Sequence, residues 1–376
     1  MVILRERFPI LGKKTYLNNC SQGALSTDVQ EAFQQYLADW DEQGSPWDRW
    51  VELYEAVRHA FAGLVNAGAD EVAVTPSVSH GVSALASAFD FTGERNKIVI
   101  SDFEFPTVGQ VWHAQAPRGA KVVRIPAAGN SIPLERFADA IDECTKLVSI
   151  SHACYRNGAM LDVPSIVELA HRKGALVLLD AYQTLGTMPI DVKQLEVDFL
   201  VGGALKYLLA PSGVALLYVR RELLPQLSPT ATGWFAQANI FAMDHTTHVP
   251  APSARRFEGG TPPVPSVYAT LAGIKLVQSV GPARIQRAVR ELTAALKAGL
   301  MQRGFNLVSP VDPGRHGALI TVRSHKVDLL VKWLAQENIV VSSRDNNLRI
   351  SPHFYNNLDD IHHLLDALGR HKALLV

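Results

Sequence analysis

Three features that often indicate a function are scarce in this chain of 376 residues: cysteine, net charge and long apolar runs. Its three cysteines, Cys20, Cys144 and Cys154, are too few for a disulfide framework and match no zinc spacing, which predicts a reducing, cytoplasmic compartment. Lys plus Arg and Asp plus Glu both number 36, so the charge balance favours neither nucleic acid nor an anionic membrane as a partner. No apolar window reaches ~18 residues, so we expect no membrane-spanning helix.

Several motifs that mark common enzyme classes are also missing. GxGxxG, GxxxxGK, GxSxG and HExxH do not occur, which argues against dinucleotide, nucleotide triphosphate, α/β-hydrolase and zinc-protease chemistry. His245 and His248 form an HxxH in a predicted loop, and His362 and His363 are adjacent on a predicted helix. None of them has carboxylate or cysteine neighbours at ligand spacing, so we predict no metal site.

What the chain does contain is an alternation of helical segments and short apolar strands. KIVIS (97–101), LVSIS (147–151), ALVLL (175–179) and VALLYV (214–219) are apolar on both faces, and a helix such as 163–172 lies between strands. This pattern is typical of a mainly parallel sheet covered on both sides, and it predicts an α/β three-layer sandwich with a mixed sheet. Binding sites in such sheets lie beyond the carboxyl ends of the strands.

The second half of the chain departs from this alternation. Residues 226–265 are rich in Pro, Thr, Gly and aromatic residues and predict a long loop, after which the pattern fits a smaller C-terminal α+β domain. We therefore predict a large domain over residues 16–255 and a small domain built from residues 1–15 and 256–376.

Two charged residues follow apolar strands 26 positions apart, at Asp180 and Lys206. A carboxylate at the end of an apolar strand needs a partner, and a protonated pyridine nitrogen is a suitable one. A desolvated lysine amine has a lowered pKa and forms imines readily. A turn aspartate and a surface lysine are the alternative interpretation of each residue taken alone.

The combination resembles the class V aminotransferase group of fold-type I pyridoxal 5′-phosphate (PLP) enzymes. That group includes cysteine desulfurases, selenocysteine lyases, isopenicillin-epimerase-like proteins and kynureninases. The resemblance extends from YLNNCSQGALS, beginning at Tyr16, to NLRISPHFYNN, ending at Asn357. It implies the PLP-dependent transferase fold type I, PLP as cofactor, an amino acid as substrate, and a homodimer with shared active sites.

The resemblance also implies roles for individual residues. Lys206 matches the lysine that forms the aldimine, and Asp180 matches the partner of the pyridine nitrogen. The other matches to the cofactor are Gln183 at the ring hydroxyl, Phe105 stacked on the ring, Val78 and Ser79 at the phosphate, His152 near the cofactor, and Thr261 reaching the phosphate from a second subunit. On the substrate side the matches are Arg349, which holds the carboxylate, with Tyr155, Arg156 and Asn19.

The sequence departs from its relatives at informative positions. Desulfurases carry a nucleophilic cysteine shortly before the arginine, but VVSSRDNN has none, and Cys20 and Cys154 are interpreted as packing residues. The Ser and His that precede the desulfurase lysine are replaced by Gly203 and Leu205, so the phosphate needs other donors. Kynureninases have Tyr where Leu205 stands, which weakens a strict kynureninase assignment.

We therefore predict a PLP-dependent aminotransferase or β-lyase that removes the α-proton of an amino acid. A kynureninase-like hydrolase, a C–S lyase or desulfurase, and an epimerase of the same group are alternatives. A non-catalytic protein that kept the fold is a more remote one.

Overall fold

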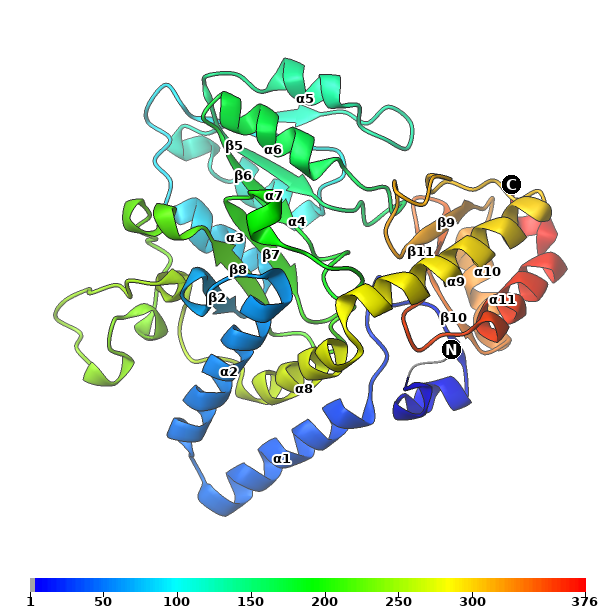
Figure 1. Cartoon of the computed structure of the whole chain (residues 1–376), viewed down its shortest axis with the longest axis horizontal. Coiled ribbons are helices and arrows are strands. Elements are labelled where there is room, and N and C mark those ends of the chain that lie inside the picture. Colours follow the sequence, from blue (N-terminus) through cyan, green and yellow to red (C-terminus); the bar gives the residue numbers. More distant parts are fainter. Residues whose placement is uncertain (1–3) are drawn as a thin grey trace.

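The computed structural model describes residues 4–376, and the chain forms a large unit around one sheet and a smaller unit beside it (Figure 1). The large sheet has seven strands in the order β2-β8-β7-β6-β5-β3-β4. Neighbouring strands are parallel except at β8, which runs antiparallel to β2 and β7. The strands of this sheet are β2 Val72–Thr75, β3 Lys97–Ser101, β4 Lys121–Ile125, β5 Thr145–Ser151, β6 Leu176–Asp180, β7 Phe199–Gly203 and β8 Ala215–Val219.

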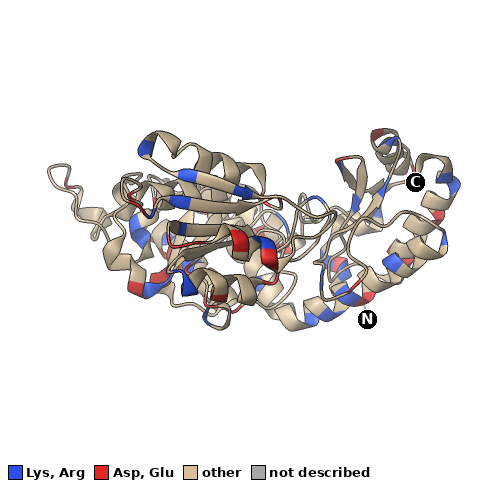
Figure 2. Ribbon diagram, turned by 90° about the horizontal axis from the view of Figure 1, so that it is seen from above, with Lys and Arg blue, Asp and Glu red and all other residues tan. Residues whose placement is uncertain are grey.

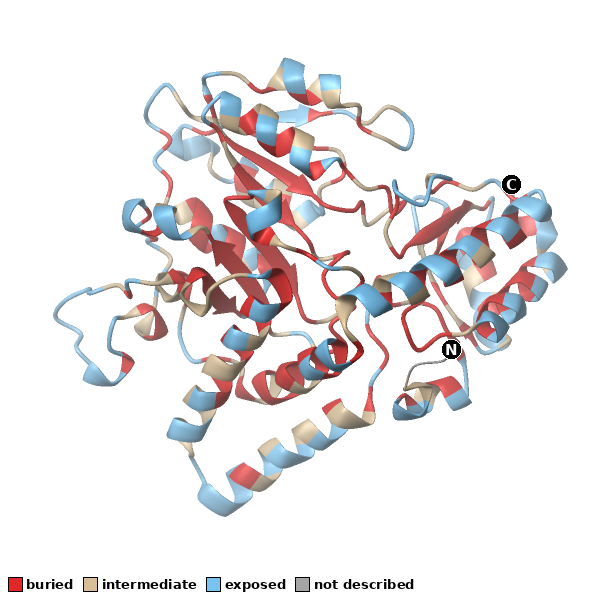
Figure 3. Cartoon of the chain, in the orientation of Figure 1, coloured by how far each residue is buried: buried red, intermediate tan, exposed pale blue. Residues whose placement is uncertain are grey.

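The central strands of this sheet are buried on both faces, as their composition predicts (Figure 3). Along β6, Val177 and Leu179 belong to one hydrophobic cluster, while Leu178 belongs to another. Successive side chains of a strand point to opposite faces, so two cores lie on the two sides of the sheet. The predicted three-layer α/β sandwich with a mainly parallel mixed sheet is confirmed.

Eleven α-helices surround the two units within residues 4–376. Ser26 caps the first of them by accepting a hydrogen bond from the Val29 N–H, at 3.2 Å. The helices are α1 Thr27–Gln43, α2 Trp47–Val65, α3 Val78–Ser87, α4 Pro106–His113, α5 Leu134–Ala140, α6 Val163–Arg172, α7 Val192–Leu195, α8 Val264–Val280, α9 Pro282–Gln302, α10 Val327–Gln336 and α11 Leu358–Arg370.

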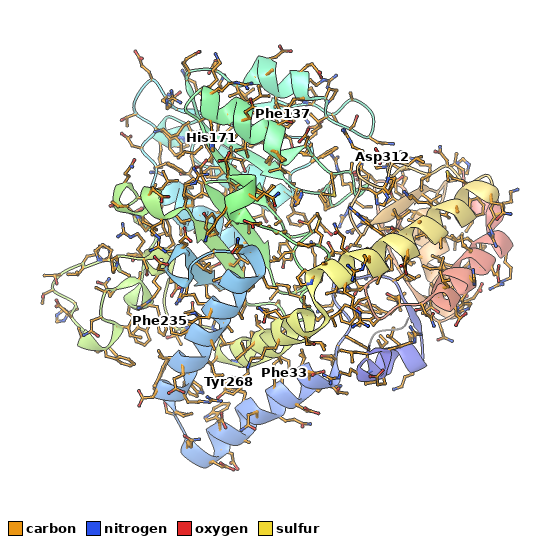
Figure 4. All side chains as sticks on the ribbon, viewed as in Figure 1. Phe33, Phe137, His171, Phe235, Tyr268 and Asp312 are labelled. Carbon is orange, nitrogen blue, oxygen red and sulfur yellow. The ribbon has the colours of Figure 1, made fainter. Side chains whose placement is uncertain are left out.

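Helix α8 packs against α1 and α2, beneath the large sheet in Figure 1. Tyr268 of α8, labelled in Figure 4, donates a hydrogen bond to Asp39 of α1 at 2.5 Å. The predicted domain boundary between residues 255 and 256 stays a prediction. Helix α8 follows this boundary in the sequence, yet its main helix contacts are with α1 and α2.

The small unit holds a three-stranded antiparallel sheet in the order β11-β12-β9, covered by α9, α10 and α11. A two-stranded parallel pair, β1 with β10, joins the N-terminal segment to this unit. The strands are β1 Thr15–Tyr16, β9 Ile320–Arg323, β10 Ile339–Val340, β11 Ser342–Arg344 and β12 Asn347–Ile350.

The charged residues of both signs are distributed over both units (Figure 2). Within residues 4–376, no helix combines the length and the apolar character needed to cross a membrane.

Candidate active site

A cavity of about 330 Å³ opens beyond the carboxyl ends of β5 and β6, next to the first turn of α3. The bend after β7 and the loop before β8 complete its wall. The edge of the sheet is the one where parallel-strand topology predicts a binding site. Seven of the residues expected at the site line this cavity: Val78, Ser79, Phe105, Tyr155, Asp180, Gln183 and Lys206.

Asp180 is the last residue of β6, and it pairs in register with Ser151 of β5 and Val201 of β7. The backbone N–H of Tyr182 donates to its Oδ1 at 2.9 Å. Burial raises the pKa of Asp180, while this hydrogen bond and the charge of Lys206 act in the opposite direction. A carboxylate here is therefore costly without a cationic partner.

Lys206 lies three residues beyond the end of β7, in a bend of the chain. Burial lowers the pKa of its amine, Asp180 and Cys20 raise it, and the charge of Arg349 lowers it slightly; the resulting pKa is about 8. At this pKa more of the amine is unprotonated near neutral pH than in an ordinary lysine, and the unprotonated form is the nucleophile.

Aromatic rings flank the Lys206 amine. Its Nζ lies 4.2 Å from the centre of the Tyr182 ring and 5.7 Å from that of Phe105. Phe105 is 42% exposed and meets Tyr155 edge to face, with 5.0 Å between ring centres. Phe105 is thus part of the cavity wall and does not belong to the hydrophobic core.

The carbonyl oxygen of Cys20 holds two predicted site residues in place. It accepts from Gln183 Nε2 at 3.2 Å and from Arg349 Nη2 at 3.4 Å. Gln183 Oε1 and Arg349 Nε are buried and have no hydrogen-bond partner within residues 4–376. Buried polar groups are normally paired, so these two atoms indicate a missing ligand.

The first turn of α3 offers an anion-binding element at the cavity. Ser77 caps the helix by accepting from the His80 N–H at 3.1 Å, and Val78 and Ser79 begin it. The first N–H groups of a helix lack intrahelical partners and lie at its positive end, which suits a phosphate.

Five expected residues do not line the cavity, and Arg349, held by the Cys20 carbonyl, is one of them. His152 is buried, and its Nδ1 lies 3.0 Å from the hydroxyl of Thr184. Asn19 donates to the carbonyl of Ser351 at 2.8 Å. Arg156 hydrogen-bonds the Asp102 carbonyl and lies 3.8 Å from Asp345, while Thr261 is exposed.

Two residues near the site were missed by the sequence reasoning. Glu104 accepts from the Ser151 N–H at 2.8 Å, and burial together with the charge of Asp180 raises its pKa to about 8. Tyr182 lines the cavity beside Lys206. Glu104 directly precedes Phe105, and Tyr182 follows Asp180 by two residues, so their proximity to predicted site residues could have identified both.

Neither buried cysteine reaches the cavity wall. Cys20 Sγ lies 3.9 Å from the hydroxyl of Ser342, and burial raises the pKa of the Cys154 thiol. A raised pKa makes a thiol a poorer source of nucleophilic thiolate.

The family model for class-V aminotransferases matches residues 15–364 of the chain. The chain belongs to the class V aminotransferase family. It is an enzyme, and its cofactor is PLP.

Curated relatives cover almost the whole length of the chain. An uncharacterized aminotransferase of Bacillus subtilis, YcbU, is 35% identical over 97% of this chain and 96% of its own length. A kynureninase of Geobacillus thermodenitrificans is 27% identical over 93% of this chain and 86% of its own.

Among solved structures, the cystine C–S lyase C-DES is similar. A variant with glycine covalently linked to its PLP cofactor superposes with a TM-score of 0.89, at 25% identity, over 97% of this chain and 98% of that one. The complex of C-DES with its product cysteine persulfide gives a TM-score of 0.88 at 25% identity, over 96% of this chain and 98% of that one.

The residues around the cavity fit PLP. Asp180 is a carboxylate that needs a cationic partner, Lys206 is an amine of lowered pKa, and Gln183 and Arg349 present unpaired buried atoms. The start of α3 supplies N–H groups for the phosphate.

Proposed function

We propose that this class V family member moves the α-proton of an amino acid substrate, as the first chemical step of an aminotransferase or β-lyase reaction. The observation that carries the proposal is that Asp180 and Lys206 line one cavity although they come from separate strand ends. When bound, PLP delocalises the negative charge left on the substrate Cα after the proton is removed.

Asp180 is the residue that would keep the pyridine nitrogen protonated. Its carboxylate is buried, so a positive charge beside it is strongly stabilised. Gln183 would donate to the ring hydroxyl, and Phe105 would cover one face of the ring. Val78 and Ser79 would hold the phosphate at the start of α3.

Lys206 would hold the cofactor covalently before substrate arrives and would then act as the base at Cα. The same lowered pKa serves both roles, because an unprotonated amine is required for bond formation and for proton removal.

Arg349 would hold the substrate carboxylate. Its guanidinium is buried, its Nε has no partner within residues 4–376, and its Nη2 is held by the Cys20 carbonyl. A guanidinium pairs with a carboxylate through two parallel hydrogen bonds, which fixes the amino acid relative to the Lys206 amine. Tyr155, on the cavity wall, would contact the substrate side chain.

An aminotransferase is the first candidate, because the 35% identical relative carries that description over nearly its whole length. A β-lyase is the second, because C-DES shares the fold at 25% identity and releases a persulfide product. The absence of a cysteine from the cavity wall disfavours a persulfide-forming desulfurase. Kynureninase-like hydrolysis and epimerisation remain alternatives that share the first step.

We further propose a cytoplasmic homodimer with shared sites. Thr261 is exposed and lies away from the cavity of its own chain, which is compatible with a contact to the phosphate of a partner subunit. Asn19 and Arg156 would contact the substrate and His152 would lie near the cofactor, although none of the three lines the cavity.

Loss of α-deuterium tests the proposed step directly. A panel of α-deuterated amino acids is incubated with the holoenzyme in water, and the exchange is followed by NMR. Exchange should occur with wild type and with Lys193→Ala, an exposed lysine of α7, and should fall at least ~10²-fold in Lys206→Ala. Full exchange in Lys206→Ala would contradict the proposal.

The same panel separates the two candidate reactions. With a keto acid present, an aminotransferase converts that acceptor into a new amino acid. A β-lyase releases keto acid and ammonia without any acceptor. If no amino acid of the panel is consumed in either arm, the proposed function is wrong.

A further inference from the structure

The side chain of Tyr182 lies where a side chain on Gly203 would otherwise be. A Cβ atom built on Gly203 would lie 2.2 Å from Tyr182 Cζ and 2.3 Å from Tyr182 Oη. These distances are far below van der Waals contact, so residue 203 must lack a side chain while Tyr182 holds this position. The phenol therefore fills the space into which a side chain at 203 would project.

Tyr182 is also fixed relative to the two central charged residues. Its N–H donates to Asp180 Oδ1 at 2.9 Å, and its ring faces the Lys206 amine, with 4.2 Å from Nζ to the ring centre. Its side chain lines the cavity. The Tyr182 ring is thus one wall of the space in which the cofactor is expected.

The Tyr182 hydroxyl can donate a hydrogen bond to a ligand. Tyr182 is half-buried, and within residues 4–376 its backbone N–H is hydrogen-bonded whereas its hydroxyl is not. Burial and the charge of Asp180 raise the pKa of Tyr182 to about 12, so the group keeps its proton across the physiological range.

Contacts between elements connect the place of the hydroxyl to the start of α3, where the phosphate is expected. The hydroxyl covers the end of β7, and β7 packs against α3, whose first turn carries the free N–H groups. Ser77, Val78, Ser79 and Tyr182 all line the same cavity. Gly203 and Leu205, which precede Lys206 in this bend, have no side-chain donor of their own.

We propose that the Tyr182 hydroxyl donates a hydrogen bond to the phosphate of PLP, from the space that a side chain at residue 203 would otherwise fill. The proposal rests on the proposed function, in that it takes the cofactor to lie between Asp180 and Lys206. It adds a cofactor ligand that replaces donors missing at residues 203 and 205.

Tyr182→Phe isolates the hydroxyl because the ring stays against Lys206. The apoprotein is titrated with PLP and, separately, with pyridoxal, which lacks the phosphate, and binding is followed by the absorbance of the bound cofactor. Loss of a hydrogen bond to a charged group should weaken PLP binding roughly tenfold or more and leave pyridoxal binding unchanged. Unchanged PLP binding, or an equal loss for both ligands, would overturn the proposal.

A second set of variants tests whether the two positions share one space. Gly203→Ser alone should lose affinity for both ligands, because its side chain meets the phenol. Combined with Tyr182→Ala, the same serine has room and brings a hydroxyl to this place. The Tyr182→Ala, Gly203→Ser protein should therefore bind PLP several-fold more tightly than Tyr182→Ala, Gly203→Ala, with no such difference for pyridoxal.

If the two double variants bind PLP equally, the shared space supplies no phosphate ligand and the proposal fails. Thermal unfolding of each apoprotein identifies a variant that has not folded. In that case the PLP and pyridoxal titrations of Tyr182→Phe alone test the proposal. Borohydride trapping on the same samples separates this failure from that of the proposed function. A label on Lys206 with unaltered Tyr182→Phe affinity overturns only the role of Tyr182, whereas a label elsewhere overturns the placement of the cofactor.

Discussion

Lys206 and Asp180 are opposite charges in one cavity, yet they form no ion pair within 4.0 Å. Each still changes the pKa of the other, Lys206 lowering that of Asp180 and Asp180 raising that of Lys206. The separation leaves room for a ligand that contacts both. Asp180 is therefore interpreted as a partner for a bound cation as well as for Lys206.

The pKa of Lys206 predicts how the apoprotein captures PLP as pH changes. Below about pH 8 the amine is mainly protonated and cannot form the covalent link, so the capture rate should rise with pH and level off above that value. Asp180→Asn removes a charge that raises this pKa, so its midpoint should move to lower pH. Stopped-flow absorbance measures both profiles, and a midpoint that stays fixed or moves upward would contradict the assignment.

Arg349→Ala should lower kcat/KM for α-amino acids by roughly 10- to 100-fold, because a charged hydrogen bond to the substrate carboxylate is lost. Arg349→Lys keeps the charge without the two-pronged geometry and should recover only part of the loss. Arg344→Ala, on the exposed end of β11, is the matched control and should behave as wild type. An unchanged kcat/KM in Arg349→Ala would mean that another group holds the carboxylate.

At the scale of elements, strands that are apolar on both faces could be predicted closely, and helix α4 could not. KIVIS is β3 residue for residue, because a fully buried strand leaves a continuous apolar run. Helix α4 has the sequence PTVGQVWH, which is short and contains Pro, Gly and β-branched residues. It forms because Val108 and Trp112 are buried in the second core, and it places Phe105 at its N-terminal end.

The contact between Tyr182 and Gly203 also could not be predicted from the sequence. The two residues are brought together because β6 and β7 are neighbours in register, with Asp180 opposite Val201. Spacing along the chain carries no information on which side chain takes the shared space.

The loop after β5 meets the small unit at a glycine that leaves no space for a side chain. Gly158 has a φ of 75°, and a Cβ on it would lie 2.1 Å from the carbonyl oxygen of Leu319. Gly304 has a similar φ of 74° with nothing within 4 Å, so it is the matched control for backbone strain alone.

Gly304→Ala should cost about 1–2 kcal/mol of stability, the strain of a left-handed alanine. Gly158→Ala should cost about 1–3 kcal/mol more, because the clash with Leu319 adds to that strain. Urea unfolding of the two apoproteins compares them. Equal losses of stability would show that the backbone at Leu319 moves aside for the added methyl group without a loss of stability.

At the scale of the whole molecule, the proposed site draws on both units, because the residues that line the cavity belong to the large unit and Arg349 belongs to the small one. Asn18 bridges to Ser351, and β1 pairs with β10, so the N-terminal segment runs between the large unit and the strand that carries Arg349. The motifs led to the prediction that Gln183 and Arg349 belong to one site. They did not predict that one carbonyl, that of Cys20, anchors Gln183 from the large sheet and Arg349 from the small one.

Shared active sites predict that PLP binding depends on assembly. The holoprotein should sediment as two chains, and dilution that separates the chains should release PLP, because Thr261 would then be lost from each phosphate site. Thr261→Val should remain a dimer and bind PLP more weakly. A monomer that retains PLP with undiminished affinity would contradict the shared site.

Covalent trapping identifies directly the residue that holds the cofactor. Holoprotein is reduced with borohydride, digested, and analysed by mass spectrometry for the phosphopyridoxyl label. The label should appear on the peptide that contains Lys206, and no label should be trapped in Lys206→Ala. A label on a different lysine, or one that persists in Lys206→Ala, would contradict the role of Lys206.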